Sequence, residues 1–140
     1  MRSRLYPFMT VVALLSIIGC GGSGGDQSDA VKVNMKFVDA METYMNDIDK
    51  ADSPSAVVDA IDAYAREIES LAPELKAIAA KHPEWKDMDK VPEELKPIQD
   101  KARKIAAQIP ATVVKTMKYM MDAQVQEAHM RLQEAMAKMQ

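Results

Sequence analysis

The chain has no glycine from Asp26 to Gln140, because all five of its glycines lie at positions 19–25. Tight β-hairpins need glycine or Asn-Gly turns, so this absence argues against a β-sheet domain. Long runs of β-branched residues are also missing, whereas Ala, Met, Lys, Glu, Gln and Leu dominate the sequence. These residues favour helices. The sequence therefore predicts an all-α protein, with one small domain at residues 30–140.

Residues that carry chemistry are scarce as well. One cysteine and two histidines leave no internal disulfide, no Cys pair and no His-x-x-x-His pair for a metal. There is no Gly-rich phosphate loop and no serine nucleophile elbow, so we expect a protein that is not an enzyme. After residue 19 the chain carries sixteen Lys and Arg against twenty-one Asp and Glu. This acidic balance, without a basic patch, argues against nucleic-acid binding.

The N-terminal segment has the pattern of a targeting signal. Arg2 and Arg4 precede an apolar run at residues 5–18, which ends at Gly19 and Cys20. The run is too short to cross a hydrocarbon core of roughly 30 Å comfortably, so it indicates a signal peptide. Residues 21–25 then read Gly-Gly-Ser-Gly-Gly, which is typical of a flexible tether.

Ile17-Ile18-Gly19-Cys20 resembles the lipobox of bacterial lipoproteins. The resemblance implies that residues 1–19 are a signal peptide and that Cys20 is lipidated, with residues 20–29 as the acylated cysteine and its Gly/Ser tether. Membrane lipid would then be a partner, bound through Cys20. Gly21 is not acidic, which in enteric-type sorting implies the outer rather than the inner membrane, on the periplasmic side. The alternative is a chance cysteine in an uncleaved signal anchor.

Apolar residues repeat at steps of three and four along the rest of the chain, which predicts amphipathic helices. The first covers residues 30–50, and the second starts at Ser53-Pro54 and runs to residue 81 with a kink or break at Pro73. The third begins at Pro92, after a loop at residues 82–91. The fourth covers residues 111–140, which contain neither proline nor glycine.

The expected architecture is a small antiparallel, up-down four-helix bundle. Pro110 leaves an alternative open, because residues 108–111 are short for a chain reversal and the apolar stripe passes from Ile109 to Val113 in register. Helices three and four are then one long kinked helix, in a three-helix arrangement.

Ten methionines follow residue 19, and Met117, Met120 and Met121 lie together. Thioethers suit Cu(I), so this trio is a candidate soft-metal cluster. Methionine also fills gaps in helix bundles, and several of these residues fall on the predicted apolar stripes. His129 borders the stripe of the fourth helix, where a histidine is either a core residue or a ligand.

Four short segments carry a resemblance to a known family: residues 41–43 (Met-Glu-Thr), 46–47, 49–52 and 56–60, with a short gap after Tyr44. They resemble the first helix and the start of the second in the cytochrome b-562 family of small periplasmic four-helix haem carriers. In that family the methionine of the Met-Glu-Thr run is one axial haem ligand, and a histidine late in the last helix is the other. Met41 matches the methionine. The family histidine lies nearly at the chain end, whereas His129 lies eleven residues before it.

The resemblance implies that Met41 and His129 hold a non-covalent haem b and that the protein carries electrons to a redox partner. In an up-down bundle the first and last helices are antiparallel, which would place the two residues at equal depth. No Cys-x-x-Cys-His motif is present for covalent haem. The alternatives are a non-haem structural or adaptor lipoprotein of the envelope, with an envelope protein as partner, and a Met-rich Cu(I)-binding protein.

Overall fold

The computed structural model describes residues 24–83, 90 and 92–139, and Cys20 with the predicted signal peptide lies outside them. Its helices are α2 (Gly24–Lys50), α3 (Pro54–Lys81), the short 3-10 helix η4 (Glu93–Leu95), α4 (Lys96–Ala106), α5 (Ile109–Met117) and α6 (Ala123–Ala137). Within this part of the chain there is no strand, which confirms the all-α prediction. None of these helices is long and apolar enough to span a membrane.

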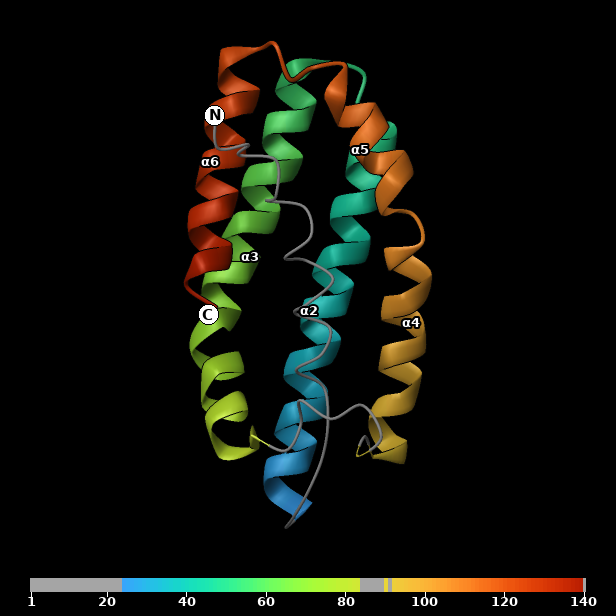
Figure 1. The fold of residues 1–140 in the computed structure, drawn as a ribbon, viewed down its shortest axis with the longest axis vertical. Coiled ribbons are helices and arrows are strands. Elements are labelled where there is room, and N and C mark those ends of the chain that lie inside the picture. The colour runs from blue at the N-terminus through green and yellow to red at the C-terminus, as the bar shows by residue number, and fades with distance from the viewer. Residues whose placement is uncertain (1–23, 84–89, 91, 140) are drawn as a thin grey trace, which may run out of the picture.

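The helices form a bundle in which successive segments run up and down (Figure 1). α3 packs antiparallel against α2, and α6 packs along the other side of α3. α4 and α5 continue in one direction and pack beside α2. The expected four helical segments are therefore confirmed, with α4 and α5 together as the third.

The neighbours in this bundle differ from those assumed for the haem site. α3 packs closely against both α2 and α6, whereas α2 and α6 do not form a closely packed pair. The first and last segments are antiparallel as expected, but they do not face each other directly. Equal depth of Met41 and His129 therefore does not follow from helix direction alone.

Ion pairs between parallel helices mark their register. Lys101 Nζ of α4 lies 2.7 Å from Asp39 Oδ1 and 2.6 Å from Glu42 Oε2 of α2. Lys115 of α5 pairs with Asp49 of α2, at 3.3 Å. On the other side, Arg131 of α6 makes two 2.9 Å hydrogen bonds to Asp62 of α3, and Lys138 pairs with Glu69.

α3 begins where the sequence predicts. Ser53 has extended backbone angles, and its Oγ accepts a hydrogen bond from Ala56 N at 3.3 Å, with Pro54 in the first turn. Pro73 does not split the helix, which runs unbroken to Lys81. Pro73 lies on the exposed face, where water can solvate a carbonyl that has lost its helical partner.

The end of the chain departs from the prediction. Residues 111–140 do not form one rod, because the chain reverses at residues 118–122, between α5 and α6. Pro110 lies in the first turn of α5, so it marks a kink between two helices of the same direction rather than the reversal. Asp122 explains the new start: its Oδ1 accepts hydrogen bonds from Gln124 N at 2.9 Å and Val125 N at 3.3 Å.

The reversal also changes which apolar residues are buried. The stripe of the first helix is confirmed, since Val33, Phe37, Met41 and Ile48 are buried and Tyr44 is partly buried. Met117 and Met121, which the periodicity placed on the stripe of the fourth helix, are 64% and 91% exposed. They are exposed because Met117 ends α5 and Met121 lies in the turn, so the two do not share the buried face of one helix.

The role of Asp122 as a helix cap is testable. Asp122→Ala should lower the free energy of unfolding by about 0.5–2 kcal/mol, because the first amides of α6 lose their acceptor. Asp122→Asn should retain most of the stability, since asparagine caps equally well. Urea denaturation followed by circular dichroism measures both, and equal losses in the two variants would contradict the cap.

Candidate functional site

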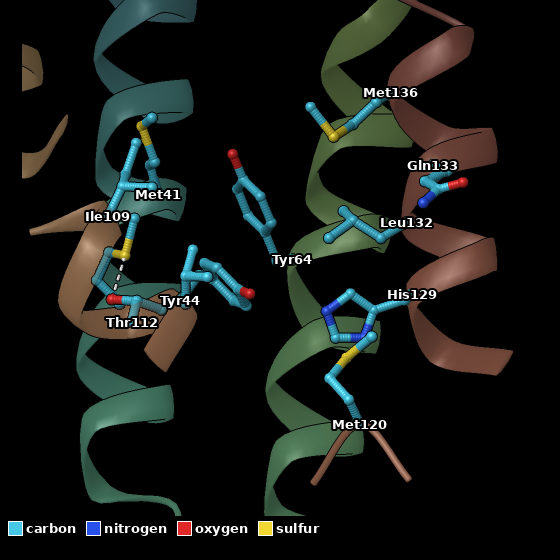
Figure 2. Close-up of a pocket in the computed structure, with 12 residues that line it drawn as sticks. Met41, Tyr44, Tyr64, Ile109, Thr112, Met120, His129, Leu132, Gln133 and Met136 are labelled. Atoms are coloured by element: carbon cyan, nitrogen blue, oxygen red, sulfur yellow. Dashed lines mark hydrogen bonds between the residues drawn. The ribbon is translucent and has the colours of Figure 1, made fainter. Parts of the chain in front are cut away.

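One apolar cavity of about 130 Å³ lies among α2, α3, α5 and α6. We call it the central cavity (Figure 2). Protein interiors have few voids larger than a water molecule, so a cavity of this size in a small bundle is a candidate binding site. Its lining consists of Met41, Tyr44, Met45, Tyr64, Ile109, Thr112, Val113, Met120, His129, Leu132, Gln133 and Met136.

Both predicted haem ligands line this cavity, at different ends. Met41, 1% exposed, projects from α2 at the upper left of Figure 2, and Met136 lies on the opposite side of the cavity. His129 lies at the lower end together with Met120, a member of the predicted methionine cluster. The other two members, Met117 and Met121, do not line the cavity.

His129 is held by its own helix. Its Nδ1 lies 3.0 Å from the carbonyl oxygen of Val125, one turn earlier in α6. A carbonyl oxygen can only accept, so Nδ1 is the donor in this hydrogen bond, and in the neutral imidazole Nε2 is then the nitrogen with the free lone pair. Figure 2 shows the outer edge of the ring, which bears Nε2, turned toward the cavity. The imidazole is therefore oriented as a ligand or hydrogen-bond acceptor.

Two tyrosines form the wall between the ends of the cavity. The rings of Tyr44 on α2 and Tyr64 on α3 are stacked, with centroids 4.8 Å apart and an interplanar angle of 15°. Burial raises the pKa of Tyr44 to about 12. Burial, and secondly the charge of Tyr44, raises the pKa of Tyr64. Both phenols are therefore neutral at physiological pH.

The sulfur of Met45 has a polar partner. Thr112 Oγ1 of α5 donates a hydrogen bond to Met45 Sδ of α2, at 3.0 Å. This contact ties α5 to α2 at the cavity wall. The structure thus brings one imidazole and four thioethers, those of Met41, Met45, Met120 and Met136, to one cavity.

The stacked rings of Tyr44 and Tyr64 lie between Met41 and His129 in this conformation (Figure 2). Met41 and His129 line the same cavity but lie at different ends of it. A haem held by both residues would therefore require the two tyrosines to move apart.

The part of the chain that the structure describes contains no group of three His, Cys, Asp or Glu side chains that could hold a metal ion. Any metal in the cavity would therefore depend on thioethers. No family model, curated protein or solved structure matches the chain. The chemistry of the site is consequently inferred from its geometry.

Sequence reasoning selected Met41, Met120 and His129 but missed the tyrosine pair and the polar contact of Thr112. A signal for the pair was present. Tyr44 and Tyr64 flank the short connection at residues 51–53, and antiparallel helices joined by a short connection bring residues on either side of it together. Only the structure shows that the two rings stack.

The tyrosines predict how stability depends on pH. Below pH 10 both phenols are protonated in the folded and unfolded states, so they leave the unfolding free energy unchanged. Between about pH 10 and 12 the unfolded chain loses these protons first, so stability falls, by up to about 1.4 kcal/mol per pH unit for each tyrosine. Tyr44→Phe and Tyr64→Phe should each flatten this fall in urea unfolding measured from pH 8 to 11.5. An unchanged slope in both variants would show that the pair is not buried.

Proposed function

We propose that this protein is a lipid-anchored binding protein of the bacterial cell envelope, whose helical bundle takes up a small ligand in the central cavity. The observation that carries the proposal is the cavity itself, with apolar walls and one imidazole nitrogen turned toward it. A buried apolar cavity of about 150 Å³ in another protein binds benzene or xenon, so about 130 Å³ is enough for a small guest. In this proposal the protein is a carrier or adaptor, not an enzyme.

The ligand proposal is tested by filling the cavity. Val113 lines it, whereas its neighbour Val114 is 66% exposed. Val113→Phe should weaken the binding of benzene at least about tenfold, which corresponds to about 1.4 kcal/mol. Val114→Phe adds the same side chain one residue away and should bind as wild type does. The measurement is the rise in melting temperature with benzene concentration.

The cavity is not a binding site if wild-type protein shows no benzene-dependent rise. The site lies elsewhere if both phenylalanine variants keep the rise. Circular dichroism of the two variants checks that each retains the helices.

The anchor is supported by the sequence around Cys20. Acyl chains bind membranes with about 0.8 kcal/mol per buried methylene, so two or three chains hold a protein firmly. Cys20→Ser should therefore move the protein from the membrane pellet to the soluble periplasmic fraction. Cys20→Ser protein that still pellets after a salt wash would contradict the lipid anchor.

Haem is a second candidate ligand, favoured by one observation: Met41 and His129 line the same cavity. The stacked Tyr44 and Tyr64 would have to separate to admit it. If they do, titration of haem into the purified domain should give a Soret band, and the low-spin spectrum should change in both Met41→Leu and His129→Ala. No Soret shift in wild type, or an unchanged spectrum in His129→Ala, would rule out this electron-carrier proposal.

A further inference from the structure

The central cavity has an unusual set of donors. The side chains that could hold a cation are four thioethers and one imidazole, and none of the twelve lining residues carries a carboxylate. Gln133, Thr112 and the two tyrosines add only neutral polar groups. An apolar guest makes no use of an imidazole nitrogen that faces the cavity. The donor set therefore favours a ligand that binds to sulfur and nitrogen donors.

We propose that the ligand of the central cavity is a Cu(I) ion, bound by His129 Nε2 and Met120 Sδ with a third thioether from the cavity wall. This inference rests on the binding function proposed above and names its ligand. The third donor comes from Met41, Met45 or Met136, whose flexible side chains reach the same space.

The metal follows from the softness of the donors. Thioethers bind Cu(I), and imidazole suits copper as well, whereas Mg²⁺, Ca²⁺ and Mn²⁺ require oxygen ligands. Structural zinc sites use combinations of Cys, His and carboxylate that the described residues do not offer.

The orientation of His129 matches that of metal-bound histidines. Such a histidine almost always donates its other ring N–H to a carbonyl, carboxylate or water, which fixes the tautomer and the ring direction. The hydrogen bond from Nδ1 to Val125 O, 3.0 Å, does this within α6. The ligand nitrogen is therefore already positioned, and binding does not have to reorient it.

Met120 is placed to bring the ion in from solvent. It lies in the turn between α5 and α6, is 38% exposed, and lines the cavity at the same end as His129 (Figure 2). Its backbone carbonyl accepts a 2.7 Å hydrogen bond from Gln126 Nε2, which ties the turn to α6. A thioether that is both exposed and part of the wall can take up an ion and pass it to the imidazole.

The test is an anaerobic titration of Cu(I) against a chromogenic Cu(I) chelator. Wild-type protein should bind one equivalent. His129→Phe and Met120→Leu should weaken binding by more than the roughly 10- to 100-fold that loss of a supporting partner costs. Met117→Leu and Met121→Leu are the matched controls, since these exposed methionines lie outside the cavity, and they should bind as wild type does.

Two results of this titration would overturn the inference. Wild-type affinity in His129→Phe would exclude the imidazole, and a loss in Met117→Leu or Met121→Leu as large as that in Met120→Leu would place the ion on the surface cluster. Methionine-methyl NMR of the wild type locates the ion without variants. One equivalent of Cu(I) should shift the methyl signals of Met120 and of at least one of Met41, Met45 and Met136, and the Met121 signal should not shift. Shifts confined to Met117 and Met121 would refute the cavity site.

The benzene measurement separates this inference from the proposed function. Benzene binding without Cu(I) binding means that the cavity is a binding site and that the copper inference is wrong. If neither benzene nor Cu(I) binds, the proposed function and the copper inference are both wrong. An equal effect of Zn²⁺ in the chelator competition would also contradict the inference, because it would show that the donors do not select a soft ion.

Discussion

The antiparallel contact between α2 and α3 is the interaction on which the rest of the bundle depends. These two helices supply most of the buried side chains, and the stacked rings of Tyr44 and Tyr64 join them at the centre. α4 and α5 then pack beside α2, and α6 packs beside α3. Because the outer segments attach to different helices of the central pair, the space between α5 and α6 is filled less completely. The central cavity lies there.

The ion pairs mark the register of the outer helices and add little stability. Exposed pairs of this kind contribute about 0–1 kcal/mol each, so they do not hold the bundle together. The contacts of Lys101 and Lys115 with α2, and of Arg131 and Lys138 with α3, instead show how each outer helix is placed along its neighbour. In this arrangement Met120 and His129 lie at one end of the cavity, and Met136 lies across the cavity from Met41.

The helical class and much of the core could be predicted, because burial imposes a period on the sequence that Val33, Phe37 and Ile48 display. The helix starts at Pro54 and just after Pro92 were also predictable, whereas the first helix begins at Gly24 rather than at residue 30. The reversal at residues 118–122 could not be predicted, because the apolar stripe continues through it. The new helix begins at a single capping aspartate, which does not interrupt that stripe. The order in which the helices pack side by side could not be predicted from the sequence either. It depends on contacts between residues 62 to 69 positions apart, such as Lys101 with Asp39 and Lys138 with Glu69.

The same limit applies to the candidate site. Composition pointed to methionine and histidine, but which thioethers share a space with His129 depends on tertiary packing. The proposed binding function requires a central cavity that a guest can enter. A crystal structure under xenon gas tests this most directly: we expect a xenon atom among Tyr64, Val113 and Leu132. Well-ordered crystals with no xenon there, and side chains that close the space, would contradict the account.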